Sequence, residues 1–293
     1  MPRSALWTLA AFGVIYIGWG STYLAVRVAV GSIPPFLVGA SRNLLAGAVL
    51  MAVGLAAGAA WPSLRAMRQA LGIGTLMFVA SHGAIAWAST RNPSGITALL
   101  VATIPLWIAV LEWMAGAAGR PSARTSLGIG LGFLGSSLLF WPAGDAPVID
   151  PLASLVTAVS ALSWAAGTLK ARRTHLSDSV SVATGLPMLL GGCALAIVSG
   201  AFGEWQTLQV AEVTGAAVTA LIYLILMGSL LGFSAYLFLL RTMPASRVAT
   251  YAYVNPVVAL ALGAWLGGEP LALMTLVAAA ISLGGVYLSV SAR

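Results

Sequence analysis

The chain has 293 residues, of which 60% are hydrophobic and 7% are charged. Soluble domains carry about 25% charged residues, so this composition excludes a water-soluble globular protein. It predicts an all-α membrane protein, and the mean hydropathy of +0.98 agrees with that class. The formal net charge is +7, but the basic residues are spread over short segments and form no single patch, which argues against nucleic acid as a partner.

Uncharged apolar runs recur along the chain, each close to the roughly 20 residues that a helix needs to cross a bilayer. Segments rich in Pro, Gly and charged residues separate these runs, which together predict ten transmembrane helices. The first five helices are expected at residues 6–27, 35–57, 70–90, 95–117 and 126–142. The second five are expected at residues 151–170, 180–202, 216–240, 246–266 and 271–290. The opening segment resembles a signal peptide but lacks a small-residue cleavage site, so it is counted as the first helix.

Lys and Arg are distributed unevenly between the two sides of this predicted series of helices. Most fall on the side of the N-terminus: Arg3, Arg65, Arg68, Arg120, Arg124, Lys170, Arg172, Arg173, Arg241, Arg247 and Arg293. The opposite side has Arg27, Arg42 and Arg91. Because cytoplasmic loops are enriched in Lys and Arg, the sequence predicts a multi-pass protein of the bacterial cytoplasmic (inner) membrane with both termini in the cytoplasm.

The ten predicted helices divide into two sets of five at the acidic stretch "PAGDAPVIDP". We therefore predict a first five-helix repeat at residues 1–142, a periplasmic connecting loop at 143–150 and a second repeat at 151–293. Residues 92–111 align with 243–262, which superimposes Pro105 on Pro256. Since five is odd, the second repeat must be inverted relative to the first. Inverted repeats are typical of transporters whose substrate site lies near the bilayer midplane, where the repeats meet.

Several motifs add a resemblance to a known family. They are "IGWGSTYLAVRVA", "PPFLVGASRNLLAG", "IPLWIAVLEW", "VNPVVALALGAWLGGEPL" and "LGGVYLSV", in that order along almost the whole chain. In order and spacing they resemble the ten-helix, EamA-type branch of the drug/metabolite transporter (DMT) superfamily, and within it the YddG-type exporters of aromatic and other neutral amino acids. The resemblance implies a basket of helices around a central cavity that opens to one side at a time. One departure is that "GRPS" in the first half stands where the second half has "GEPL".

His82 lies in the middle of the third predicted helix, far from either end. A buried neutral histidine can be satisfied by neighbouring hydroxyls or carbonyls. Ionisable groups inside membrane spans are rare, however, and they usually face a cavity and serve a function. At helical spacing Phe78 and Ala86 share its face, whereas Ser81 is not expected to do so.

Aromatic and polar residues recur at three- and four-residue spacing in several predicted helices, which places each group on one helix face. Tyr16, Trp19 and Tyr23 form such a stripe in the first helix, with Gly20 and Thr22 beside them. Each stripe could be helix packing, but stripes on five helices favour a common cavity for a small, partly apolar ligand. The predicted substrate-binding residues are Trp19, His82, Thr103, Trp107, Ser160, Trp164, Tyr251 and Asn255.

Three further residues are predicted to serve as hinges or gates. Pro105 and Pro256 each lack a backbone donor and should kink their helices, either as static kinks or as paired hinges for alternating access. Arg42 is too deep for easy snorkelling, so it either pairs with backbone carbonyls or forms part of an outer gate. Near the cytoplasmic end, Glu112 is predicted to pair with Arg120 or Arg124, and the runs "GLGFLG" and "SLGGV" are predicted to allow close helix packing.

The sequence therefore predicts a small-molecule exporter that acts as a monomer. No Walker-type "GKS" or "GKT" occurs, so ATP is not expected to drive it, and no cofactor or metal is expected. Either His82 couples transport to proton movement or the protein is a passive facilitator, which we favour. A multidrug or other metabolite exporter is the nearest alternative. The sequence has no convincing catalytic groups for an intramembrane enzyme, and a structural or sensor subunit would not need a polar cavity.

Overall fold

The computed structural model describes residues 3–116, 120–139, 149–243, 248 and 250–291, and helices are the regular secondary structure throughout these ranges. In the first half the elements are α1 (Arg3–Gly13), η1 (Val14–Gly18), α2 (Trp19–Ala29), α3 (Pro35–Ala56), α4 (Leu64–Gly74), η2 (Thr75–Gly83), α5 (Ala84–Ala88), α6 (Ser94–Val101), α7 (Ile104–Met114) and α8 (Ala123–Leu138). In the second half they are α9 (Pro151–Arg172), α10 (Val180–Ala201), α11 (Glu204–Thr207), η3 (Val210–Glu212), α12 (Gly215–Tyr223), η4 (Leu224–Leu231), α13 (Gly232–Thr242), α15 (Tyr251–Trp265) and α16 (Leu273–Ser291).

Each predicted span has a helical counterpart in the described residues. Eight helices are long and apolar enough to cross a membrane, and α15 is a shorter apolar helix. The remaining predicted span corresponds to α8, which has 16 residues. The predicted end at residue 142 and the predicted start at residue 246 lie outside the described residues. The chain is therefore an all-helical, multi-span membrane protein.

Proline and short polar residues set the starts of the helices. Ser63, Ser122, Ser179 and Thr214 each accept a hydrogen bond from a backbone N–H in the first turn of the helix that follows. Asp150 does the same for α9, whose first residue is proline. These caps mark the ends of the loops that the hydropathy pattern predicts.

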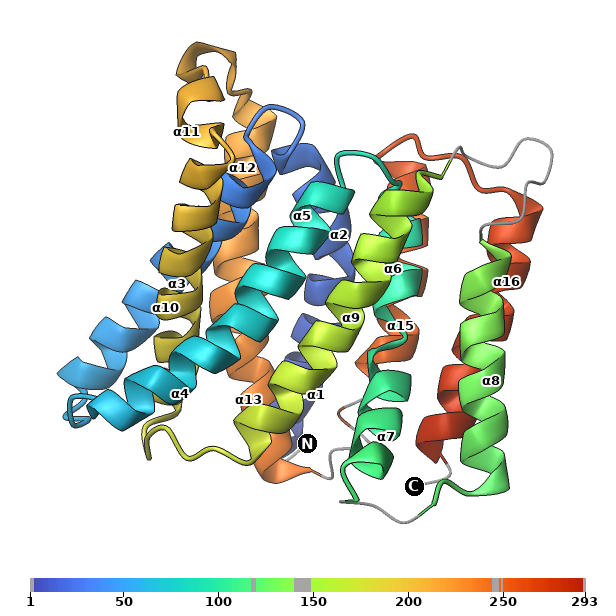
Figure 1. The fold of residues 1–293 in the computed structure, drawn as a ribbon, viewed down its shortest axis with the longest axis horizontal. Coiled ribbons are helices and arrows are strands. Elements are labelled where there is room, and N and C mark those ends of the chain that lie inside the picture. Colours follow the sequence, from blue (N-terminus) through green and yellow to red (C-terminus); the bar gives the residue numbers. More distant parts are fainter. Residues whose placement is uncertain (1–2, 117–119, 140–148, 244–247, 249, 292–293) are drawn as a thin grey trace.

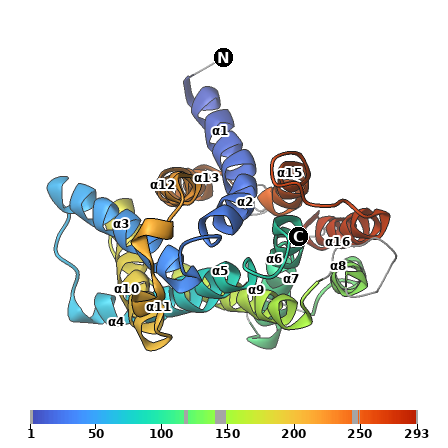
Figure 2. The same ribbon diagram turned by 90° about the horizontal axis from the view of Figure 1, so that it is seen from above.

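Figure 1 shows both termini at one end of the helical bundle. Seen from above, α3 lies beside α10 at one end of the long axis, and α8 lies beside α16 at the other (Figure 2). The rod formed by α1, η1 and α2, the rod formed by α12, η4 and α13, and α15 lie opposite α5 and α9 across the middle of the molecule. Helices of both groups contribute residues to the cavity described below.

The pairing of α8 with α16 depends on glycine. A Cβ atom at Gly135 would collide with the backbone of Ser282, and one at Gly285 would collide with the backbone of Gly132. The same holds for α3 against α10, where a Cβ at Gly47 would lie 2.5 Å from the backbone nitrogen of Leu189. Small residues let membrane helices approach this closely. The prediction that "GLGFLG" and "SLGGV" allow close packing is confirmed, and the two runs pack against each other.

Two carboxylates of the second half, one at the start of α11 and one in the loop before α16, hold helix starts of the first half. Glu204 accepts hydrogen bonds from the backbone N–H groups of Phe36 and Leu37, at 3.1 and 2.9 Å. Glu269 accepts from the backbone N–H and the hydroxyl of Ser94, at 2.8 and 3.0 Å, and pairs with Arg27 at 3.3 Å. Each carboxylate therefore satisfies N–H groups that have no partner within their own helix.

The structure corrects two details of the sequence-based description. The predicted helix at 95–117 is broken into α6 and α7 by turn residues Ala102 and Thr103. Pro105 lies in the first turn of α7, where its missing N–H is tolerated. Glu112 pairs with Arg172 of α9 at 3.1 Å and not with Arg120 or Arg124, because α7 packs against α9.

Three of the rods contain a π-helical segment that hydropathy does not reveal: η1, η2 and η4. A π turn admits an extra residue, so it changes the direction in which the following side chains point. All three segments lie in rods that border the middle of the bundle (Figure 2).

Candidate substrate cavity

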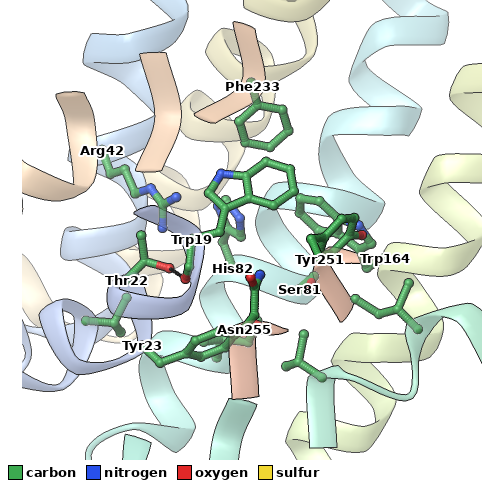
Figure 3. A pocket seen from close by; sticks show the side chains of 14 residues that line it. Trp19, Thr22, Tyr23, Arg42, Ser81, His82, Trp164, Phe233, Tyr251 and Asn255 are labelled. Carbon is green, nitrogen blue, oxygen red and sulfur yellow. Dashed lines mark hydrogen bonds between the residues drawn. The ribbon is translucent and has the colours of Figure 1, made fainter. Parts of the chain in front are cut away.

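A cavity of about 90 Å³ lies in the middle of the bundle, bordered by side chains from helices of both halves. Six of the predicted site residues line it: Trp19, Arg42, His82, Trp164, Tyr251 and Asn255. Figure 3 shows them converging on one space from separate elements. By volume this space has room for several water molecules. Its walls are aromatic and aliphatic with a few polar groups, which is typical of small-molecule sites.

His82 is held in the cavity wall by one hydrogen bond and two rings. Its Nδ1 lies 3.3 Å from Oδ1 of Asn43, and the Asn43 amide nitrogen donates to the carbonyl of Gly39 at 2.8 Å. Because Asn43 uses its donor on Gly39, its oxygen is left to accept, which assigns the hydrogen to Nδ1 of His82. In the neutral ring Nε2 is then an acceptor.

The His82 ring is stacked on Trp164, with centroids 5.3 Å apart and an interplanar angle of 23°. Phe78 presents its edge to the same imidazole at 5.2 Å. The predicted contact of Phe78 with the His82 face is thus present. The stacked pair forms a flat wall that a ligand ring can extend.

Trp19 forms the opposite part of the lining and is fixed by its indole nitrogen. Nε1 donates to the carbonyl of Gly228 in η4 at 3.0 Å. Phe233 and Tyr251 contact its ring at centroid distances of 5.4 and 5.2 Å, both edge-on. The hydrogen bond and the two ring contacts thus fix Trp19 in the cavity wall.

Arg42 reaches the cavity from α3 and is only 7% exposed. Its Nε donates to the hydroxyl of Ser229 in η4 at 2.8 Å. The guanidinium lies against Gly228, where a Cβ would come within 2.8 Å of Nη2. The Ser229 hydroxyl, in place of the predicted backbone carbonyls, thus holds the guanidinium against Gly228. The role of Arg42 in an outer gate stays a prediction.

Asn255 lines the cavity from α15, beside Pro256. With its amide nitrogen turned toward the first helix, it donates to the carbonyls of Tyr251, Ile15 and Tyr16 at 3.2, 3.0 and 3.1 Å. Gly20 permits this approach, since a Cβ there would meet the side chain of Val258. Glycine at this position therefore allows the close packing of α2 against α15.

Three predicted substrate-binding residues lie outside the cavity lining: Thr103, Trp107 and Ser160. The hydroxyls of Thr103 and Ser160 are buried and donate to backbone carbonyls one turn earlier, those of Leu100 and Thr157. Trp107 packs edge-on against Phe133 at 4.8 Å, toward α8. Val101 and Ile104, on the two sides of the break between α6 and α7, line the cavity instead.

Four further polar or aromatic residues line the cavity: Thr22, Tyr23, Ser81 and Phe233. Ser81 was expected to face away from His82, but both residues line the space. They lie in η2, and in a π turn neighbours are closer in angle than the roughly 100° that separates them in an α-helix. Phe233 follows η4 and carries no sequence signal of its own. Within the described ranges, no group of three His, Cys, Asp or Glu side chains is placed to hold a metal ion.

The sequence matches the EamA-like transporter family over two segments, residues 5–141 and 151–291. It is 34% identical to the inner membrane transporter YedA of Escherichia coli (strain K12) over 270 residues, which cover 92% of this chain and 86% of that protein. It is 24% identical to a probable amino-acid metabolite efflux pump of Salmonella typhimurium, with 94% and 92% covered. A solved crystal structure matches with a TM-score of 0.65 at 22% identity over 97% of this chain and 96% of that one, which supports the fold. The chain therefore belongs to the EamA-like transporter family.

Proposed function

We propose that this protein exports small metabolites, chiefly aromatic and other neutral amino acids, through the central cavity by alternating access. The observation that carries the proposal is the cavity wall itself, in which Trp164 is stacked on His82 and faces a second aromatic group around Trp19. Flat apolar walls with few hydrogen-bonding groups suit a ligand with a large side chain and a compact polar end. The name of the Salmonella relative, an amino-acid metabolite efflux pump, supports the same substrate class.

We also propose that the chain consists of two inverted five-helix repeats, residues 1–142 and 151–293, joined by residues 143–150. The two family matches, at 5–141 and 151–291, support this division. Helices at equivalent places in the two repeats pack together: α3 with α10, α6 with α15, and α8 with α16. Most of the 143–150 loop lies outside the described residues.

Both termini are proposed to lie in the cytoplasm, with the protein in the bacterial inner membrane. The termini share one end of the bundle (Figure 1), and most Lys and Arg residues belong to the loops at that end. YedA, the relative from Escherichia coli, is named an inner membrane transporter. We propose that the protein acts as a monomer.

We propose passive facilitation as the driving mechanism. Arg42 and His82 are the basic residues of the lining, and no carboxylate lines the cavity in the described part of the chain. Proton-driven transporters commonly use an acidic relay at depth. His82 could carry a proton in its place, and this alternative is an outcome of the test that follows.

The test is efflux from proteoliposomes loaded with radiolabelled L-phenylalanine or L-alanine, with protein-free liposomes as the control. We expect release down the concentration gradient alone, faster for phenylalanine, and unchanged when a pH gradient is imposed. Release that requires a pH gradient would show that transport is coupled to protons through His82 and is not passive. If neither amino acid leaves faster than from protein-free liposomes, the proposed function is wrong.

A further inference from the structure

The cavity contains a buried cation that the proposed function does not yet use. Arg42 is 7% exposed and its guanidinium borders the central space (Figure 3). Burying a charge inside a membrane protein is costly unless an opposite charge or several hydrogen bonds compensate it. The identity of the compensating group therefore bears on what the cavity binds.

No carboxylate of the described residues compensates Arg42. Five of these acids are engaged elsewhere: Glu112 with Arg172, Asp150 with Arg91, Asp178 with His175, Glu204 with the start of α3, and Glu269 with Arg27. Glu212 is exposed in η3, outside the cavity. Asp145 lies outside the described residues. Within the described ranges the cavity lining thus has a positive charge without a negative one.

The guanidinium is nevertheless held in one place. Nε donates to the Ser229 hydroxyl at 2.8 Å, and the plane lies against Gly228, which has no side chain to displace it. Nη1 and Nη2 have no hydrogen-bond acceptor among the residues that the structure describes. A guanidinium anchored through Nε leaves its two terminal nitrogens for a bidentate acceptor such as a carboxylate.

A second polar group in the lining also lacks a partner. The hydroxyl of Ser81 is buried, with the residue 1% exposed, and has no hydrogen-bond partner in the described part of the chain. Buried hydroxyls are usually satisfied, and an unsatisfied one in a cavity wall indicates a missing ligand or water. Ser81 and Arg42 line the same space from different helices.

We propose that Arg42 binds the carboxylate of the transported substrate, so that the cavity selects carboxylates over amines of the same shape. The inference rests on the proposed function, since it places one end of the substrate whose ring contacts Trp19 and Trp164. The substrate class is thereby narrowed to compounds with an aromatic or large apolar group and a carboxylate. The α-ammonium group of an amino acid is not required, because no carboxylate among the described lining residues pairs with it.

The first experiment compares three ligands on the wild-type protein in lipid nanodiscs by equilibrium binding. L-Phenylalanine has both charges, 3-phenylpropionate keeps the carboxylate, and phenethylamine keeps the ammonium. We expect 3-phenylpropionate to bind at least as tightly as phenylalanine, and phenethylamine to bind about tenfold or more weakly, as the loss of a charged hydrogen bond implies. Phenethylamine binding equal to or tighter than that of 3-phenylpropionate overturns the inference without any variant.

The second experiment uses Arg42→Gln and Arg42→Lys, with Arg91→Gln as the matched control on the surface. Arg42→Gln should weaken 3-phenylpropionate about tenfold or more and leave phenethylamine unchanged or improved. Arg42→Lys, which keeps the charge but not the planar pair of donors, should fall between wild type and Arg42→Gln. Arg91→Gln removes the same charge outside the cavity and should bind all three ligands like wild type.

The outcomes distinguish a failure of this inference from a failure of the proposed function. If phenylalanine is released from proteoliposomes but Arg42→Gln weakens phenylalanine and phenethylamine equally, export stands and the carboxylate role of Arg42 is wrong. If 3-phenylpropionate binds and phenylalanine neither binds nor leaves proteoliposomes, Arg42 keeps its role and the proposed amino-acid range is wrong. Absence of binding for both carboxylates contradicts the inference.

Discussion

Trp164 shows how single side chains shape the cavity. It lies at midspan, away from the interfacial zone where tryptophan is usually enriched, and it presents a face to His82. Replacement by alanine would remove half of the stacked pair and widen the space. The loss of transport should depend on which group of the substrate occupies that space, because ring–ring contacts contribute about 0.5–1.5 kcal/mol beyond buried area.

We therefore expect Trp164→Ala to reduce transport of phenylalanine about tenfold while alanine transport falls by less than twofold. Initial rates in proteoliposomes at subsaturating substrate measure both. Phe36→Ala is a suitable control, since that ring contacts Phe202 near the loops and not the cavity. Equal losses for phenylalanine and alanine would mean that Trp164 supports the fold and not an aromatic subsite.

Sequence patterns locate part of this site and miss the rest for a physical reason. His82, Trp19 and Trp164 are conspicuous because polar or amphipathic side chains at mid-depth are costly without a purpose. Ser81 and Phe233 are ordinary residues in apolar runs, and nothing in their spacing marks them as cavity residues; Ser81 lies in η2 and Phe233 in α13. Thr103 and Ser160 look like site residues, yet their hydroxyls bond to their own helices.

At the scale of elements, the three π-helical segments each serve a polar contact of the cavity. η2 carries Ser81 and His82, and η4 carries the Gly228 carbonyl and Ser229 hydroxyl that hold Trp19 and Arg42. η1 offers carbonyls to Asn255. Such segments interrupt the regular α-helical bonding pattern, which makes them suited to functional contacts. Hydropathy cannot reveal them because it reports the polarity of side chains and not the hydrogen-bonding pattern of the backbone.

Pro256 lies inside α15 next to Asn255, and it cannot donate to the carbonyl of Ala252 one turn earlier. Pro256→Ala restores that donor and stiffens the helix. If α15 bends during alternating access, the variant should lower the maximal transport rate severalfold while the dissociation constant for phenylalanine changes by less than twofold. Proteoliposome rates and nanodisc binding measure the two quantities. A wild-type rate would show that the kink is static.

The α8–α16 contact provides a test of packing with an internal control. Gly285→Ala places a methyl group on the backbone of Gly132, whereas nothing lies within 4 Å of a Cβ at the neighbouring Gly284. We expect Gly285→Ala to destabilise the protein by about 1–3 kcal/mol and Gly284→Ala to have little effect. Thermal unfolding in detergent compares them. Equal melting temperatures would show that α8 and α16 can separate without cost.

At the scale of the whole molecule, composition and hydropathy are enough to predict an all-helical, multi-span membrane protein. They work because a span needs about 20 apolar residues and must satisfy its own backbone. They miss the break between α6 and α7, since Ala102 and Thr103 are not unusual in a helix. They also cannot show that Glu112 reaches Arg172, because helix neighbours depend on packing far apart in sequence.

The proposed orientation can be checked with single cysteines. In a Cys193→Ser background, Asp178→Cys lies in the loop after α9, at the end that holds the termini, and Gln209→Cys lies between α11 and η3 at the other end (Figure 1). With both termini cytoplasmic, a membrane-impermeant maleimide should label Gln209→Cys in spheroplasts and Asp178→Cys only after permeabilisation. The reverse pattern would invert the topology.

The carboxylates of Glu204 and Glu269 have a consequence for biosynthesis. Both are translated after residue 151, yet they accept hydrogen bonds from the first turns of α3 and α6. Until they leave the ribosome, these two helix ends stand at the membrane surface with bare N–H groups. A nascent chain that stops near residue 150 thus lacks the carboxylate acceptors for these N–H groups. Cellular proteases should degrade it far faster than the completed polypeptide.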